Sequence, residues 1–384
     1  MKKLCMITTI SLTLKSFVVE TAKYLHEKCD YDVTLICSED EKFAASLPDC
    51  IHYIPVHMAR GIDASAIQSI RKFKEIFKRE QFDLIQYATP NAACYASIAA
   101  KSVGAPIRLY CQWGIRYVGM SGVSRIIFKA IEKMVCRNST HIRAVSPMNL
   151  AFAVKEGLYP LEKAKVIGHG GTIGVDMQHF ALSKKQEWRA KVRQAYGLKE
   201  DDFVFGFAGR VSPDKGCAEL IAAFQQVARK HQVAKLLIVG PFEDNCGIAS
   251  ELVQWAKASD HVKLTGLVEN AEMREYYAAM DVLVHPTYRE GFGMVIQEAG
   301  ALAVPVITTK IPGASEVMED GVSCKLVTPK DASELVLAMK KLISDSEYSK
   351  QIGQAAYDRT KQYYDRTIML ENQKADYRTI LEIG

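Results

Sequence analysis

Short runs of apolar residues alternate with longer amphipathic stretches along most of the chain. Apolar runs between turns are typical of strands buried on both faces of a parallel sheet. The runs predict strands at residues 4–10, 32–37, 51–56, 82–88, 107–112, 141–145, 203–209, 234–240, 282–284 and 304–309. Stretches between them predict helices, for example at 16–28, 64–79 and 91–103. Strand, helix and strand joined by short turns form right-handed parallel units, so we expect an α/β fold with doubly wound sheets.

The length of the chain and one break in this alternation predict two domains. A chain of 384 residues exceeds what a single core usually organises. Residues 177–200 are charged and mostly helical in pattern, and a second series of strands begins after Asp202. We therefore place a first domain at 1–180, a second at 181–361 and a helical segment at 362–384.

The stretch HPTYREGFGMVIQE, from His285 to Glu298, combines a strand end, a glycine turn and a helix start. Backbone N–H groups at a helix start point outward and can bind polar ligands. Gly291 and Gly293 allow a ligand to lie against the backbone. Glu290 and Glu298 are eight positions apart, about 12 Å by helical rise. Two carboxylates at this spacing suit the two ends of one long polar ligand, such as a sugar nucleotide.

A second motif, GFAGRVSPDKG from Gly206 to Gly216, lies between a predicted strand and a helix at 217–230. Arg210 and Lys215 are five positions apart beside glycine turns at a helix start. Two cations in this setting are suited to hold a diphosphate.

Together the two motifs resemble the retaining glycosyltransferases of family 4. The resemblance runs nearly end to end and implies a GT-B architecture, with two Rossmann-like domains facing a central cleft. ITTISLTLK near the start and KVIGHGGTIGVD at 165–176 resemble enzymes that extend undecaprenyl-diphosphate sugars in capsular polysaccharides and lipid-linked glycans. By this resemblance the first domain binds the acceptor, the second binds the nucleotide sugar, and the last helix crosses back onto the first.

The resemblance also implies roles for individual residues. Arg210 and Lys215 would neutralise the leaving diphosphate, and Glu290 would bind the donor sugar. Glu298 would hold the ribose hydroxyls, and the backbone at Leu267 the nucleobase. The implied catalytic residues are Arg210, Lys215 and Glu290, and the implied donor-binding set is Gly209, Arg210, Lys215, Gly240, Leu267, Glu290, Gly291, Phe292, Gly293, Met294 and Glu298. Retaining members are thought to react on one face of the sugar, so we name no protein nucleophile.

Five residues of the first domain are candidates for the acceptor cleft, each with a plainer alternative: Lys15, Gln112, Trp113, Arg116 and His169. Lys15 lies in the predicted loop 11–16, where many relatives carry a glycine pair, and is otherwise a solvated lysine. Gln112 stands near where many relatives have a histidine, and it cannot titrate. The aromatic loop 113–120 either binds a ligand or packs into the core. His169 is either a polar contact or a structural histidine.

Positive charge is concentrated in the first domain. Residues 60–140 carry 13 Lys or Arg and five Asp or Glu, a local charge of +8 against +5 for the whole chain. In a predicted helix at 124–136, Arg125, Lys129 and Lys133 are spaced four apart. The region 116–137 therefore fits an anionic membrane surface, where each nearby cation contributes about 1 kcal/mol. The alternative is an ordinary solvated helix face. No nucleic-acid-binding motif accompanies the charge, so we expect no nucleic acid partner.

Other features bound the location and the cofactors. The ten cysteines are scattered without metal-ligand spacing, which favours reduced thiols in the cytoplasm. The N-terminal LCMITTISLTL is diluted by hydroxyl residues, so we prefer a first strand to a signal peptide. No apolar run reaches membrane-spanning length.

The sequence offers one formal match to a metal-binding pattern, Asp30-Tyr31-Asp32. It precedes the predicted strand 32–37, at the end of the sheet that lies away from the cleft, so we reject it as a metal site. We expect no metal and no cofactor besides the UDP-sugar substrate.

Three functions are consistent with the sequence. The first is transfer of an N-acetylhexosamine or hexose from UDP to a polyprenyl-diphosphate-linked acceptor, by an enzyme peripheral to the inner face of a bacterial plasma membrane. The second is transfer to a soluble acceptor. The third is a non-catalytic sugar-nucleotide-binding protein with the same fold. A nicotinamide oxidoreductase is disfavoured, because no G-x-G-x-x-G follows either domain's first strand.

Overall fold

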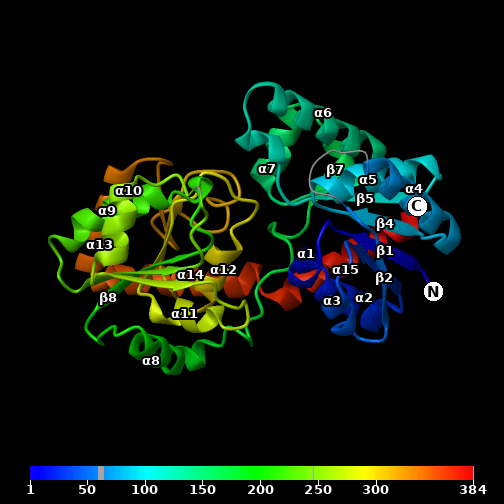
Figure 1. Cartoon of the computed structure of the whole chain (residues 1–384). Helices are drawn as coiled ribbons and strands as arrows, with labels where there is room; N and C mark the ends of the chain where they lie inside the picture. Colours follow the sequence, from blue (N-terminus) through cyan, green and yellow to red (C-terminus); the bar gives the residue numbers. More distant parts are fainter. Residues whose placement is uncertain (59–64, 245, 384) are drawn as a thin grey trace. The chain divides into compact units, whose positions relative to one another are not determined.

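The computed structural model of the chain describes residues 1–58, 65–244 and 246–383 (Figure 1). It divides into two compact units, Met1–Ile173 with Thr367–Gly384, and Gly174–Arg366. The sequence pattern places the first boundary at 180 and the start of the last segment at 362, whereas the chain passes between the units at 173/174 and 366/367.

Unit 1 is built on a seven-stranded parallel sheet of order β3-β2-β1-β4-β5-β6-β7. Its strands are β1 (Lys3–Ile7), β2 (Asp32–Cys37), β3 (Ile51–Pro55), β4 (Leu84–Tyr87), β5 (Ile107–Gln112), β6 (His141–Ala144) and β7 (Ala164–Val166). Its helices are α1 (Ser11–Phe17), α2 (Val19–Cys29), α3 (Glu41–Ala45), α4 (Ser65–Glu80), α5 (Pro90–Ser102), η1 (Arg116–Gly119), α6 (Gly122–Asn138), α7 (Pro147–Lys155), η2 (Leu161–Lys163) and nearly all of α15 (Arg366–Ile383). Residue 64, the first of the predicted helix 64–79, lies outside the described residues.

Two apolar clusters cover the faces of this sheet. On one face, residues of α4, α5, α6 and α7 pack against the strands. On the other face, residues of α1, α2 and α3 pack together with Tyr377, Ile380 and Leu381 of α15. The last helix, far away in the sequence, is therefore part of the core of unit 1.

Unit 2 contains a six-stranded parallel sheet of order β10-β9-β8-β11-β12-β13. Its strands are β8 (Phe203–Ala208), β9 (Ala234–Val239), β10 (Val262–Gly266), β11 (Val282–His285), β12 (Val306–Thr309) and β13 (Lys325–Val327). Its helices are η3 (Leu182–Lys184), α8 (Lys185–Ala195), η4 (Pro213–Lys215), α9 (Cys217–Ala228), α10 (Ser250–Ala258), α11 (Met273–Ala279), α12 (Met294–Ala301), α13 (Ala332–Ser344) and α14 (Ser346–Tyr363). Helices α9, α10 and α13 cover one face of the sheet, and α8 and α11 lie on the other (Figure 1).

Both units are doubly wound and Rossmann-like, as the sequence predicts. In each sheet the strand order reverses beside the first strand, between β1 and β4 and between β8 and β11. Loops at the carboxyl ends of such strand pairs diverge and leave a crevice in which ligands bind. The loops after β8 and β11 carry the two motifs singled out in the sequence, so the topology brings those motifs together.

The start of unit 1 differs from the sequence prediction. Residues 11–16 form most of α1, not a loop. The segment SLTLKSF contains neither glycine nor proline, and Leu14 is buried in the core, so helix formation is favoured on both counts. Lys15 consequently lies on the exposed side of a helix.

Candidate functional site

The loops after β8 and β11 meet through an ion pair. Lys215 Nζ lies 2.9 Å from Glu290 Oε2, although the two residues are 75 positions apart. A backbone hydrogen bond also joins the two loops, since Tyr288 N–H donates to the carbonyl of Asp214 at 2.8 Å. Gly216 has φ +67°, and a Cβ there would lie 2.0 Å from the carbonyl oxygen of Pro286. Only glycine fits this close approach, which fixes Lys215 against the end of β11.

The Glu290 carboxylate is the centre of the polar cluster. Its Oε2 accepts hydrogen bonds from Lys215 and from His285 Nε2, at 2.9 and 3.0 Å. Its Oε1 accepts a longer bond, 3.2 Å, from the N–H of Gly291. Burial by itself would raise the pKa of Glu290, but the bond from His285 and the charge of Lys215 outweigh it and lower the pKa to about 2. Glu290 is therefore ionised at neutral pH, with Lys215 as its cationic partner.

Glu298 is in a different environment, about one turn into α12. Its Oε2 accepts a hydrogen bond of 2.7 Å from the hydroxyl of Tyr277, a fully buried residue of α11. Burial raises the pKa of Glu298 to about 7, against the smaller opposing effects of the Tyr277 bond and the charge of Arg366. The two glutamates thus differ in charge, one fully ionised and the other partly protonated at neutral pH.

The start of α12 is shaped by glycines, as the motif indicates. Gly293 precedes the helix with φ +39°. Gly313, from the loop after β12, packs so closely that a Cβ there would lie 2.3 Å from the carbonyl oxygen of Gly291. Phe292 is buried with its ring 5.6 Å from that of Tyr364, which anchors the turn. Met294 is the first residue of the helix.

The remaining donor-site candidates line the neighbouring strand ends. A Cβ at Gly240 would lie 2.0 Å from the carbonyl oxygen of Gly209, so these two loops are in backbone contact. The exposed Arg210 side chain pairs with Glu243 rather than with Glu290. Leu267 is exposed just beyond β10.

The first-domain candidates do not form one cluster. Lys15 and His169 are exposed, on α1 and in the loop after β7. Arg116 is exposed on η1, with its guanidinium carbon 4.6 Å from the Phe128 ring centroid. Trp113 is half-buried and its ring centroid lies 5.5 Å from that of Phe17. Contacts between these four residues and an acceptor therefore stay a prediction.

Gln112 requires a correction, because its side chain is 0% exposed. Its amide nitrogen donates to Glu132 Oε1 at 2.6 Å, and its amide oxygen accepts from the Tyr159 hydroxyl at 2.7 Å. The hydroxyl of Tyr110 donates to the same Glu132 oxygen at 2.9 Å. Gln112 satisfies a buried carboxylate in the interior and does not present a contact to an acceptor.

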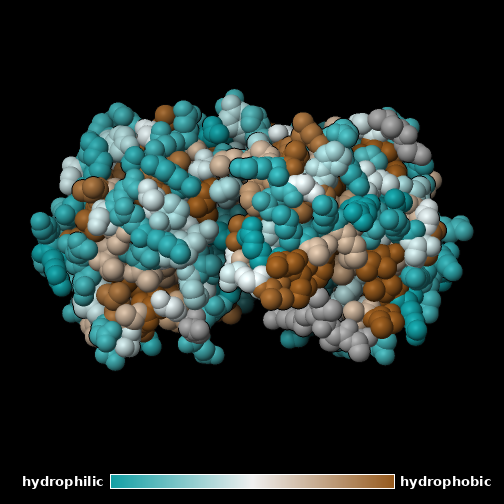
Figure 2. All heavy atoms as spheres, turned by 90° about the horizontal axis from the view of Figure 1, so that it is seen from above, coloured by the Kyte–Doolittle hydropathy of each residue, from teal (hydrophilic) through white to brown (hydrophobic). Residues whose placement is uncertain are grey.

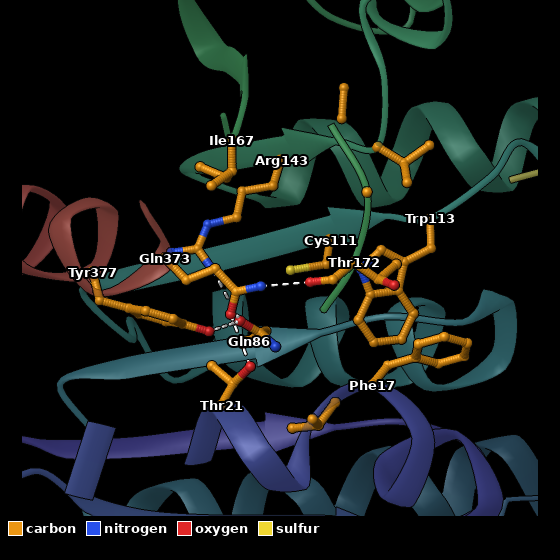
Figure 3. Close-up of a pocket in the computed structure, with 14 residues that line it drawn as sticks. Phe17, Thr21, Gln86, Cys111, Trp113, Arg143, Ile167, Thr172, Gln373 and Tyr377 are labelled. Carbon is orange, nitrogen blue, oxygen red and sulfur yellow. Dashed lines mark hydrogen bonds between the residues drawn. The ribbon is translucent and has the colours of Figure 1, made fainter. Parts of the chain in front are cut away.

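A small pocket lies at the carboxyl edge of the unit 1 sheet, next to α15 (Figure 3). Trp113 and Phe17 form part of its wall. Gln373 accepts from the Thr21 hydroxyl at 2.8 Å and donates to the carbonyl of Thr172. The cavity volume is about 30 Å³, enough for water and far below the roughly 300 Å³ or more of a typical ligand pocket. The polar side chains around the pocket therefore hydrogen-bond α15 to neighbouring segments of unit 1.

Sequence reasoning missed three partners of the site. His285 opens the motif, yet nothing in its spacing from Glu290 indicates contact. Tyr277 and Asp214 likewise carry no signal, because their contacts depend on which strands are neighbours. The buried pair of Arg143 with Asp376, which joins β6 to α15, was also not predicted.

Two negative findings concern the described residues alone. Within residues 1–58, 65–244 and 246–383, no group of three or more His, Cys, Asp or Glu is placed to hold a metal ion. Asp32 of the formal metal pattern begins β2, at the amino edge of the sheet. None of the helices over these ranges is both long and apolar enough to cross a membrane.

Comparison with known proteins defines the class. The family model "Glycosyl transferases group 1" matches residues 189–359, and "Glycosyl transferase 4-like" matches residues 3–146. The Anabaena protein Alr3699/HepE, solved in complex with UDP, superimposes with a TM-score of 0.79 at 22% identity, covering 99% of this chain and 100% of that one. The same protein has been solved with UDP-glucose, with a TM-score of 0.80. The fold is thus that of the GT-B glycosyltransferases.

Two relatives bring the comparison to the level of a family. The capsular polysaccharide biosynthesis glycosyltransferase CapM of Staphylococcus aureus is 30% identical over 362 residues, 94% of this chain and 93% of CapM. The UDP-Gal:alpha-D-GlcNAc-diphosphoundecaprenol alpha-1,3-galactosyltransferase of Escherichia coli is 22% identical over 82% of this chain and 81% of its own length. The chain belongs to the family 4 glycosyltransferases of GT-B fold.

Proposed function

We propose that the protein transfers a hexose or N-acetylhexosamine from a UDP-sugar to a polyprenyl-diphosphate-linked saccharide, in the biosynthesis of a surface polysaccharide. The observation that carries the proposal is the cluster of Lys215, Glu290 and His285 at the strand-order reversal of unit 2, beside Arg210. The names of CapM and of the E. coli galactosyltransferase support a polysaccharide product and a lipid-linked acceptor. The UDP complexes of the Anabaena protein support the nucleotide.

The proposed donor spans the crevice between the loops of unit 2. Its diphosphate takes up the charge of Lys215 and of Arg210, which exchanges its exposed pair with Glu243 for the phosphate oxygens. Glu290 and the helix start at Gly293 and Met294 bind the sugar hydroxyls. Glu298 accepts from the ribose hydroxyls, and the backbone beside Leu267 meets the base.

The proposed reaction needs no protein nucleophile and no metal. Charge develops on the departing diphosphate, and two cations aimed at it stabilise the transition state. The configuration at the anomeric carbon is retained when the acceptor hydroxyl attacks from the face that the phosphate leaves. The leaving phosphate oxygen then takes the acceptor's proton.

A lipid-linked acceptor is favoured by the surface of α6. Val123 and Ile126 are 72% and 70% exposed on its first turns, and Ile127 and Val118 are also exposed. Figure 2, which looks down on the side where Figure 1 draws α6, shows hydrophobic atoms at the surface among polar ones. Exposed apolar side chains with flanking cations are typical of helices that lie in a membrane interface.

Cations surround these apolar residues. Arg116, Arg125, Lys129 and Lys133 lie on η1 and α6, and the one acidic residue of α6, Glu132, is buried. Glu156 pairs with Lys129 at 2.8 Å and lies 3.9 Å from Arg125, so part of the charge is already neutralised. We propose that this face rests on the anionic inner leaflet of a bacterial plasma membrane. Residues 60–64 of the basic stretch lie outside the described residues.

The function is tested by nucleotide release across a panel of UDP- and GDP-sugars, in EDTA, with and without a short polyprenyl-diphosphate-sugar. Release from a UDP-sugar that requires the lipid acceptor and persists in EDTA is expected. Nucleotide release with a soluble sugar acceptor would contradict the lipid-linked acceptor and support transfer to a soluble acceptor instead. Binding without release for every acceptor would favour a non-catalytic protein.

The membrane contact is tested separately with vesicles containing about one third anionic lipid. Ile126→Glu places a charge in the exposed apolar face and is expected to abolish co-sedimentation. Leu337→Glu is the matched control, because Leu337 is 67% exposed on α13 in the other unit. Equal binding of the two variants would contradict the role of α6.

A further inference from the structure

His285, at the end of β11, is buried with 1% of its surface exposed. Its ring lies nearly parallel to that of Phe207, with centroids 6.2 Å apart and an interplanar angle of 22°. Its backbone carbonyl accepts from the hydroxyl of Thr308 at 2.9 Å. Its Nε2 reaches Glu290 Oε2 at 3.0 Å. Packing and backbone bonds therefore fix the ring in place and aim one nitrogen at the carboxylate.

The partner decides which nitrogen carries the proton. An ionised carboxylate can only accept hydrogen bonds, so His285 Nε2 is the protonated nitrogen. Nδ1 is buried without a hydrogen-bond partner among the described residues. Burial lowers the pKa of His285, so a second proton on Nδ1 is disfavoured. His285 is a neutral donor to Glu290, and Lys215 supplies the positive charge.

Glu290 Oε2 accepts hydrogen bonds from both Lys215 and His285, but only Lys215 has another proposed ligand. In the proposed function Lys215 also serves the diphosphate, and its ammonium must turn toward the phosphate oxygens to do so. His285 has no such alternative, because the ring is enclosed by Phe207 and the strand. Without His285, the carboxylate would keep one bond, the 3.2 Å contact from Gly291 N–H.

We propose that His285 is a positioning residue that holds Glu290 in its sugar-binding orientation while Lys215 binds the diphosphate. This inference rests on the proposed function and deepens it, since it assigns recognition of the sugar, as distinct from the nucleotide, to a pair of residues. UDP lacks the sugar, so its binding does not use Glu290. The signature of the role is a loss of preference for UDP-sugar over UDP.

The test measures dissociation constants of UDP, UDP-glucose and UDP-N-acetylglucosamine by calorimetry, together with kcat and KM, on the full chain. His285→Phe keeps a flat ring and removes the N–H. It is expected to lower kcat/KM about 10- to 100-fold, the range for one hydrogen bond to a charged group, while the UDP constant changes less than twofold. His285→Gln retains an N–H donor and is expected to recover most of the loss.

A purely structural role for the ring predicts a different pattern. Phe207→Leu disturbs the packing of the ring and leaves the hydrogen bond, so it is expected to lower the melting temperature and keep the preference for UDP-sugar. If His285→Phe keeps the wild-type preference, or if the Gln variant is as impaired as the Phe variant, the positioning role is refuted. If the wild-type protein shows neither a preference for a UDP-sugar nor transfer, the proposed function itself fails.

Discussion

The hydrogen bond from the Tyr277 hydroxyl holds the pKa of Glu298 below the value that burial alone would give, and its removal has a calculable effect on donor binding. A hydrogen bond to a charged group contributes about 1.5–3 kcal/mol, and one pKa unit corresponds to about 1.36 kcal/mol. Tyr277→Phe therefore raises the pKa of Glu298 by about one to two units above its present value of about 7. The ring is buried and only the oxygen is lost, so the fold around it is kept.

This shift changes donor affinity at neutral pH. An ionised carboxylate accepts both ribose hydroxyls, whereas the protonated group offers one fewer acceptor site. At pH 7 the ionised fraction falls from about one half to about one tenth or less, by the one- to two-unit shift. The donor KM is expected to rise about fivefold or more at pH 7, with the gap closing above pH 9.

The assay is the pH profile of the donor KM between pH 5.5 and 9.5. The wild-type KM is expected to fall as pH rises through about 7, and the Tyr277→Phe profile to shift to higher pH. Tyr276→Phe is the matched control, because the neighbouring Tyr276 hydroxyl lies 3.4 Å from that of Tyr196 and has no contact with Glu298. Superimposable profiles for wild type and Tyr277→Phe would refute the proposed coupling.

Three further outcomes are expected. Burial raises the pKa of Glu298 in the folded protein from 4.5 to about 7. Its contribution to the free energy of unfolding is therefore complete below pH 4.5 and is lost as the pH rises through 7. Relative to wild type, the free energy of unfolding of Glu298→Gln should rise by up to about 3 kcal/mol between pH 5 and pH 8, as measured by thermal melts. Gly216→Ala should lose at least about 2 kcal/mol and most activity, whereas Gly197→Ala, with similar φ and open space, should lose about 1 kcal/mol in urea titrations. Asp281 accepts from two arginines and from Val204 N–H, each at 2.7 Å, so Asp281→Ala should lose about 3 kcal/mol by the same measurement.

The fold class follows from local information. Apolar runs report that a strand is buried on both faces, and their alternation with amphipathic stretches predicts parallel units. The error at residues 11–16 has a local cause as well. The sequence predicts a loop there because a loop usually follows the first strand, but the segment has no glycine or proline and buries Leu14, which favours a helix.

The candidate site was predictable in its motifs and not in its contacts. The positive φ angles at Gly216 and Gly293 agree with the glycines of the two motifs. Gln112 is predicted as a cleft residue because many relatives have a histidine near this position. Its side chain turned inward because the buried Glu132, 20 positions further on, requires hydrogen-bond donors.

By itself the sequence determined which segments are strands, which turns need glycine, and which charged residues flank those turns. Only the tertiary structure decided that Lys215 and His285 share the carboxylate of Glu290. It also decided that burial raises the pKa of Glu298, against a smaller opposing effect of the Tyr277 hydrogen bond. The return of the last helix to the first domain is implied by the resemblance, and the structure shows which of its residues, Tyr377, Ile380 and Leu381, enter the core. The reason is physical: a hydrophobic period shows which face of an element is buried, but the partner on that face depends on strand order, which no local pattern specifies.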